Sequence, residues 1–320
     1  MKRIGIIGLG QWGKNIVSQV QGKSNKIQIM AAWSRSSEKI SEFCANHQIE
    51  VRNDFDNILD DNSIDAVIIA GPGHLHAETA KAALSANKHT MVIKPIALNK
   101  KDADQIKNLA LSKGLTLALG FDRCFLPSVD ELRKHVRAGD LGKIIHAEGN
   151  FCVPRFFNLI EGDWKAGNRF NPPGSLADHM LYLMIELIGP VKALSVQGRR
   201  NAASVEIADT VSISLKFEDE ALGTLTAIGV TPSFERLHFF GTKGWAEIKD
   251  RSHFEFKSID GKSSSLQLEV DQLLLRQLDA FADAIEEKRP FPVPLDVAVN
   301  SAACFDAMQR SYANAQWEYL

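Results

Sequence analysis

The hydrophobic pattern of the first 120 residues predicts buried strands that alternate with amphipathic helices. Continuous apolar runs are typical of strands covered on both faces of a parallel sheet. These runs are Arg3–Ile7, Ile27–Trp33, Asp65–Ala70, Thr90–Ile93 and Thr116–Leu119. The helix-like stretches between them are Gly13–Val20, Ser37–Asn46, His76–Ala86 and Lys101–Ser112. Because strand–helix repeats form right-handed crossovers, residues 1–120 are predicted to be a doubly wound α/β domain with a parallel sheet.

The pattern changes after Gly120, where apolar and polar residues alternate in segments separated by short turns. The segments are Lys143–Cys152, Lys192–Arg199, Thr210–Phe217, Ala221–Val230, Glu235–Phe240, Gly244–Asp250 and His253–Ile259. Helices are predicted at Val129–Ala138, about Gln272–Glu287 and about Asp296–Gln316. We therefore expect an α+β domain over residues 121–320 with a large, mostly antiparallel open sheet. Its last helix, about residues 296–316, can pack back on the first domain.

Composition narrows the class of protein. The chain has 320 residues, enough for two domains, with 45% hydrophobic and 24% charged residues as in soluble globular proteins. A net charge of −2 gives no reason to expect nucleic acid or a membrane surface as a partner, and no apolar run is long enough to span a bilayer. The four cysteines are scattered without a CxxC pair, so we expect no metal site and a reducing, cytoplasmic location.

A glycine-rich loop follows the first strand directly. The segment Gly8-Leu9-Gly10-Gln11-Trp12-Gly13 matches GxGxxG between a strand and a helix. The first glycine permits a tight turn, the second lets the backbone approach a pyrophosphate, and the third allows close helix–strand packing. The helix N-terminus offers N–H groups to phosphate. The loop is therefore predicted to bind a dinucleotide.

The end of the second strand indicates which dinucleotide. An NAD-binding domain usually carries an acidic residue there for the ribose 2′-hydroxyl. Here the strand ends in Trp33-Ser34-Arg35-Ser36-Ser37, with no carboxylate before Glu38. Arg35 can pair with a 2′-phosphate and the serines can donate to it, which favours NADP(H) over NAD(H). The alternative is a solvated loop whose Ser36 or Ser37 only caps the next helix.

The third and fourth strands end in Ala70-Gly71-Pro72-Gly73-His74-Leu75-His76 and Ile93-Lys94-Pro95. With Gly139-Asp140-Leu141-Gly142 and Gly241-Thr242-Lys243-Gly244 further on, the chain resembles the Gfo/Idh/MocA oxidoreductases over nearly its whole length. The resemblance implies a Rossmann domain whose two strand ends lie at the cofactor. His76 is expected to open a helix with its ring near the cofactor. It also implies a homodimer or homotetramer formed through the open C-terminal sheet.

The family's Glu-Lys-Pro signature is Ile93-Lys94-Pro95 in this chain. The resemblance implies that Lys94 is catalytic: it would hold the substrate oxygen and could shuttle a proton. A second family signature, Asp-x-x-x-His, is represented by Asp178 and Tyr182. Their i,i+4 spacing places both on one helix face, with His179 about 100° away. Tyr182 would then handle the proton.

Both helix residues also have structural interpretations. Ser175-Leu176-Ala177-Asp178 is compatible with a capping box, and Tyr182 with packing in an apolar helix. Further substrate-binding candidates are Arg123, Trp164, Lys165 and His179.

Two functions remain open at this point. One is NADP(H)-dependent hydride transfer to or from a hydroxyl or carbonyl carbon of a sugar, polyol or cyclic diol-like small molecule. The other is a weakly active or inactive regulator that senses NADP(H) or a sugar. It is suggested by Ile93 and Tyr182, which replace the family's Glu and His. The sequence does not choose among the substrates.

Overall fold

The computed structural model describes residues 1–162 and 172–320, excluding the side chains of residues 172–175. It divides into two compact units. The first unit comprises Met1–Asp122 and Gln272–Ala302, and the second comprises Arg123–Asp271 and Ala303–Leu320. The first break lies beside the predicted boundary near residue 120. The second unit, however, is not the continuous 121–320 segment that the sequence pattern predicted, because residues 272–302 return to the first unit.

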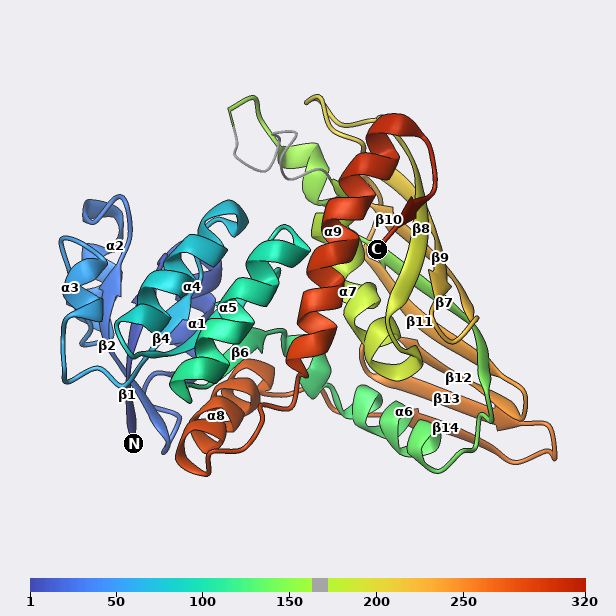
Figure 1. Cartoon of the computed structure of the whole chain (residues 1–320), viewed down its shortest axis with the longest axis horizontal. Helices are drawn as coiled ribbons and strands as arrows, with labels where there is room; N and C mark the ends of the chain where they lie inside the picture. The colour runs from blue at the N-terminus through green and yellow to red at the C-terminus, as the bar shows by residue number, and fades with distance from the viewer. Residues whose placement is uncertain (163–171) are drawn as a thin grey trace. The chain divides into compact units, whose positions relative to one another are not determined.

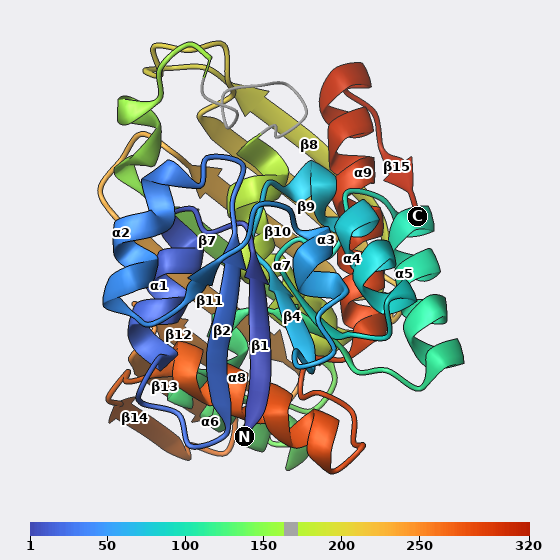
Figure 2. The same cartoon turned by 90° about the vertical axis from the view of Figure 1, so that its left-hand side faces the viewer.

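A six-stranded parallel sheet forms the centre of the first unit, in the order β3-β2-β1-β4-β5-β6. Its strands are β1 (Lys2–Ile7), β2 (Ile27–Trp33), β3 (Glu50–Val51), β4 (Ala66–Ile69), β5 (His89–Ile93) and β6 (Leu117–Gly120). The strand order reverses between β1 and β4, so the carboxyl ends of these strands flank the crevice where such sheets bind ligands. The predicted doubly wound Rossmann fold is confirmed, and Figure 2 shows β1, β2 and β4 side by side.

Helices of the first unit pack through apolar faces. They are α1 (Gln11–Val20), α2 (Glu38–Asn46), α3 (Asp56–Leu59), α4 (His76–Ser85), α5 (Lys100–Lys113), α8 (Leu273–Glu286) and the first part of α9 (Leu295–Asn314), with the 3-10 turn η1 at Gly73–Leu75. Helix α8 contacts α1 and β2, and buries Leu274, Leu278, Phe281 and Ile285 at helical spacing. The sequence pattern missed β3 and α3 because two and four residues are too few to show periodicity.

The second unit is built on a nine-stranded sheet in the order β14-β13-β12-β11-β7-β10-β9-β8-β15. Its strands are β7 (Ile144–Cys152), β8 (Val191–Arg199), β9 (Thr210–Phe217), β10 (Leu222–Ile228), β11 (Phe234–Gly241), β12 (Gly244–Lys249), β13 (His253–Ser258), β14 (Ser263–Gln267) and β15 (Glu318–Tyr319). Only the β7–β10 pair is parallel, which confirms the mostly antiparallel prediction. The pattern missed β14 and β15, which lack an apolar alternation.

Helices of the second unit cover one face of this sheet, and the end of α9 packs on β8, where the backbone N–H of Val196 donates to the Ser311 hydroxyl at 2.9 Å. Helix α6 (Pro127–Arg137) packs on β12 and β13, and α7 (Pro172–Ile188) packs on β7 to β10. Figure 1 shows both along the same side of the sheet, leaving the opposite face without a helix of this unit among the described residues. The 3-10 turns η2 (Asp122–Phe125) and η3 (Pro154–Asn158) complete the elements. No helix among residues 1–162 and 172–320 could span a membrane.

Candidate active site

The glycine-rich loop needs glycine for reasons that the structure makes explicit. Gly8 has φ of +98°, and a Cβ there would lie 2.4 Å from the backbone nitrogen of Gly71. A Cβ on Gly13 would lie 2.8 Å from the carbonyl oxygen of Gly8. A Cβ on Gly10, in contrast, would meet no atom within 4 Å. The loop is therefore packed tightly at its two ends and open at its centre, a shape that fits the approach of a pyrophosphate to the backbone.

The N-terminus of α1 adds to this cradle. Gly10 is the N-cap residue in an extended conformation and brings no side chain to the helix end. No acidic residue lies in the first turn of α1, so the partial positive charge of the helix end is not neutralised there. Gln11 and Trp12 are both exposed, and the Gln11 amide donates to Asn15 at 3.1 Å. These features suit a dinucleotide phosphate.

The end of β2 presents the predicted phosphate-binding segment. Arg35 is exposed and Ser34 and Ser36 are half-buried. Within the part of the chain that the structure describes, Arg35 forms no ion pair, so its guanidinium can accept an anionic ligand. Ser37 precedes α2 without a side-chain hydrogen bond to the helix end, so the capping alternative does not apply to this residue.

The carboxyl ends of β4 and β5 lie next to one another because these strands pair in parallel. After β4, Ala70 is buried, Gly71 and Pro72 are half-buried, and His74 is exposed. Directly after β5, Lys94 is half-buried, and its backbone N–H donates to the carbonyl oxygen of Gly120 at 3.2 Å. The sheet therefore fixes the backbone of Lys94 at the edge that carries the glycine-rich loop.

That the ring of His76 lies near the cofactor stays a prediction, and the structure shows which groups of the chain the ring contacts. His76 does open α4, but its side chain is only 1% exposed. Nδ1 lies 2.7 Å from the carbonyl oxygen of Pro95, and Nε2 lies 2.9 Å from that of Gly71. Both ring nitrogens thus face the protein backbone rather than a ligand.

In the second unit, α7 carries Asp178 and Tyr182 one turn apart, with relative exposures of 0% and 1%. Because α7 begins at Pro172, Ser175 lies inside the helix, and the capping-box interpretation of Asp178 is wrong. Burial and the negative charge of Asp178 raise the pKa of the Cys304 thiol well above its usual value. The sequence pattern gave no sign of this neighbour, because it comes from α9.

Arg123 and His179 are brought together in a buried cluster. Arg123 donates to both carboxylate oxygens of Glu235, Nε to Oε2 at 3.2 Å and Nη2 to Oε1 at 2.9 Å, and Nη1 donates to Nδ1 of His179 at 2.9 Å. The His179 ring stacks on Phe151 with centroids 4.2 Å apart. Burial alone would raise the pKa of Glu235, but the charge of Arg123 and hydrogen bonds from Arg123 and Arg251 lower it overall. Arg123 is thus tied to a carboxylate of the chain itself.

Glu235, Arg251 and Phe151 were not predicted from the sequence. Strand β11 brings Glu235 to Arg123 across 112 residues, and no local pattern announces such a pair. The remaining two candidates, Trp164 and Lys165, lie outside the described residues.

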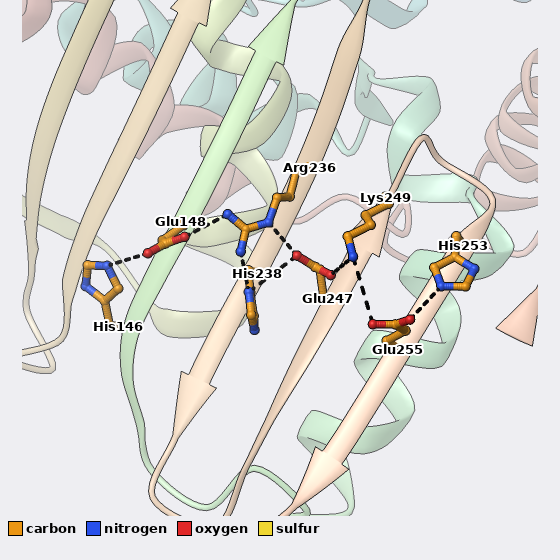
Figure 3. A network of polar contacts seen from close by, with 8 residues as sticks. All are labelled: His146, Glu148, Arg236, His238, Glu247, Lys249, His253 and Glu255. Atoms are coloured by element: carbon orange, nitrogen blue, oxygen red, sulfur yellow. Dashed lines mark hydrogen bonds and ion pairs between the residues drawn. The ribbon is translucent and has the colours of Figure 1, made fainter. Parts of the chain in front are cut away.

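A second polar cluster lies on the sheet face opposite α7 (Figure 3). It consists of His146, Glu148, Arg236, His238, Glu247, Lys249, His253 and Glu255. Arg236 pairs with Glu148 at 2.9 Å and also with Glu247, which pairs with Lys249 at 2.7 Å. Burial would raise the pKa of Glu247, but hydrogen bonds from Arg236 and Lys249 lower it overall. Three carboxylates and two cationic side chains alternate in this network, so each cation is paired and one negative charge is left over when the histidines are neutral.

A glycine-rich loop at the switch point of a parallel sheet is typical of dinucleotide-binding domains, and Lys94 directly follows β5 at the same edge, two strands from β1. The comparisons with known proteins agree. Residues 2–121 match the family model described as "Oxidoreductase family, NAD-binding Rossmann fold", and residues 129–247 match the "GFO/IDH/MocA C-terminal domain". The chain belongs to the Gfo/Idh/MocA family and is an NAD(P)-dependent oxidoreductase.

Curated relatives include the scyllo-inositol 2-dehydrogenase (NADP(+)) IolU of Bacillus subtilis, 28% identical over 224 residues. This match covers 67% of the chain but only 66% of IolU, slightly less than two thirds of that protein. The uncharacterized oxidoreductase YrbE of the same organism is 26% identical, with 97% of the chain and 94% of YrbE covered. Among solved structures, a levoglucosan dehydrogenase in complex with NADH and L-sorbose is similar with a TM-score of 0.89 and 19% identity, covering 99% of this chain and 98% of that one. The structural likeness supports the fold.

Proposed function

We propose that this protein is an NADP(H)-dependent oxidoreductase that transfers a hydride to or from a hydroxyl or carbonyl carbon of a sugar, polyol or cyclic diol. The observation that carries the proposal is Lys94, which the β5–β6 pairing holds at the same sheet edge as the glycine-rich loop. The names of the relatives support the substrate class: one acts on scyllo-inositol, and another, of Paenarthrobacter nicotinovorans, is a D-xylose dehydrogenase.

The preference for NADP(H) rests on the segment after β2. Arg35 is exposed, and no carboxylate lies between Trp33 and Glu38 to contact a ribose 2′-hydroxyl. A guanidinium presents several donors to a 2′-phosphate, and the half-buried Ser34 and Ser36 add hydroxyl donors. The name of IolU includes NADP(+), whereas the levoglucosan dehydrogenase was solved with NADH. Because these two relatives differ in cofactor, the proposed preference rests on this chain's own residues.

The residues of the chain have distinct roles in the proposed reaction. When bound, the nicotinamide supplies or accepts the hydride. The Lys94 ammonium hydrogen-bonds the substrate oxygen and stabilises the negative charge that develops on it. The Tyr182 hydroxyl, or Lys94 itself, exchanges the proton of that oxygen, and Asp178 orients a neighbouring hydroxyl. Asp178 and Tyr182 are 0% and 1% exposed, so these roles require that the groups covering them move when substrate binds.

We also propose that the protein forms a homodimer or homotetramer through the sheet face of Figure 3. The side chains of the network there are mostly half-buried, and Leu222 on β10 adds an exposed apolar residue across from His146. We propose a cytoplasmic location as well, since the four cysteines are buried thiols.

A substrate screen tests the proposed function. Wild-type protein is incubated with NADP⁺ or NAD⁺ and a panel of inositols, pentoses, hexoses and cyclic diols, and NADPH or NADH absorbance is followed. Turnover of at least one polyhydroxylated substrate, faster with NADP⁺ at low cofactor concentration, is the expected result. Tight NADPH binding without turnover of any substrate in either direction would instead support the sensor function.

A further inference from the structure

The buried imidazole of His76 lies between two loops that leave the cofactor edge of the first unit. Its Nδ1 lies 2.7 Å from the carbonyl oxygen of Pro95, which directly follows Lys94. Its Nε2 lies 2.9 Å from the carbonyl oxygen of Gly71 in the loop after β4. With 1% of its surface exposed, the ring is enclosed by the backbone it contacts.

These contacts connect the glycine-rich loop to Lys94. The loop after β4 packs directly on Gly8, since a Cβ there would lie 2.4 Å from the Gly71 nitrogen and 2.6 Å from its Cα. The contacts therefore run without a gap from Gly8 through Gly71, His76 and Pro95 to Lys94. The loops after β4 and β5 thus meet at the His76 ring, and the loop after β1 packs on the first of them.

The two ring contacts are not equivalent. A carbonyl oxygen only accepts hydrogen bonds, and a neutral imidazole carries one N–H. Burial lowers the pKa of His76, although the contacts with the carbonyl oxygens of Pro95 and Gly71 act in the opposite direction, and this favours the neutral ring. We assign the proton to Nδ1 because its contact is the shorter one. Nε2 then lies against the Gly71 carbonyl without donating to it.

We propose that His76 is a positioning residue that holds the turn at Lys94 and Pro95 against the cofactor loops through its Nδ1–H bond to Pro95. Its importance for turnover rests on the catalytic role proposed for Lys94. Displacing a reacting group by about 1 Å can cost about 10²-fold in rate. A loss of this bond is therefore expected to reduce kcat without removing any group that contacts cofactor or substrate.

Two substitutions separate the two ring nitrogens. In His76→Asn the amide nitrogen lies near the place of Nδ1, so the bond to Pro95 can form. In His76→Gln it lies near the place of Nε2, so only Gly71 can be reached. We expect His76→Gln to lower kcat by about 10- to 100-fold while the Kd for NADPH, measured by fluorescence titration, changes less than about threefold. We expect His76→Asn to keep most of the wild-type kcat, because it retains the bond to Pro95.

Hydrogen exchange measured by mass spectrometry provides a readout that does not depend on activity. In His76→Gln the peptide containing Lys94 and Pro95 should exchange faster than in wild type, and in His76→Asn it should not. This comparison decides the positioning role even if wild-type protein turns over no substrate, an outcome that refutes only the proposed function. The proposal is overturned if the two variants have equal kcat and equal hydrogen exchange at Lys94 and Pro95. It is also overturned if His76→Gln, rather than His76→Asn, keeps the wild-type values.

A measurement on wild-type protein covers the case in which His76→Gln does not fold. With ¹⁵N-labelled histidine, the signal absent from His76→Asn should report an Nδ1–H tautomer. An Nε2–H tautomer would contradict the assigned bond to Pro95.

Discussion

Single side chains at strand ends determine the chemistry proposed for this protein. A backbone hydrogen bond to the sheet fixes Lys94, whereas Arg35 lies in the loop that follows β2. What each side chain offers a ligand depends on its charge and its reach. Lys94 is in place although Ile93 replaces the family glutamate, because the Gly120 carbonyl anchors the lysine backbone. The charge and reach of these two residues can be tested separately.

Arg35→Ala is expected to weaken binding of NADPH but not of NADH. A charged hydrogen bond contributes about 1.5–3 kcal/mol, so the KM for NADPH should rise by about 10- to 100-fold while that for NADH changes little. Steady-state kinetics with both cofactors measures this. Lys39→Ala removes a nearby exposed positive charge from α2 and is the matched control. An equal rise for both cofactors in Arg35→Ala would contradict the NADP(H) assignment.

Tyr182→Phe removes only a hydroxyl from a buried ring. If that hydroxyl exchanges the proton, kcat should fall by about 10²- to 10⁴-fold while the ring still fills its place in α7. Stopped-flow kinetics with saturating cofactor and a melting curve together measure the effect. A lowered melting temperature with unchanged kcat would mean that Tyr182 is a packing residue and that Lys94 handles the proton.

At the scale of elements, the loop between β1 and α1 needs glycine for two different reasons at two positions. Gly13 lets α1 approach the strand, whereas Gly10 leaves open space. Gly13→Ala places a Cβ 2.8 Å from the Gly8 oxygen and should destabilise the fold by about 1–3 kcal/mol. Gly10→Ala meets no steric obstacle and should cost at most about 1 kcal/mol, through the poorer N-cap, but it should weaken NADPH binding.

Chemical denaturation and NADPH titration of both glycine variants distinguish the two effects. If Gly10→Ala binds NADPH as tightly as wild type, the loop does not approach the pyrophosphate as proposed.

The elements with strong local patterns were predictable from the sequence. Continuous apolar runs located β1, β2 and β4, because strands buried on both faces need apolar residues throughout. The glycine spacing located the loop, because backbone geometry restricts the residue type. The start of α7 at Pro172 was not predicted, and this changed the interpretation of Asp178. The clusters around Arg123 and His76 depend on contacts across strands, which no local pattern encodes.

At the scale of the whole molecule, the open face of the nine-stranded sheet is the proposed contact between copies. Leu222 is 52% exposed on the same side of β10 as Thr224, opposite the buried Leu225. Leu222→Asp should therefore leave the protomer folded and shift the assembly toward monomer. Sedimentation velocity over a range of concentrations measures the shift.

A matched control is Leu111→Asp, at a 62% exposed leucine on α5 of the first unit, which should not change the assembly. If wild type is a monomer at all concentrations, or if both variants dissociate equally, the sheet face is not the contact.

The central claim is that Lys94 makes a nicotinamide-binding fold an active oxidoreductase. The most direct measurement compares kcat and the NADPH Kd of Lys94→Ala with those of wild type and of Lys101→Ala, an exposed lysine on α5. We predict that Lys94→Ala lowers kcat by at least about 10²-fold while its NADPH Kd remains within about threefold, and that Lys101→Ala matches wild type. Turnover by Lys94→Ala at the wild-type rate would contradict the account.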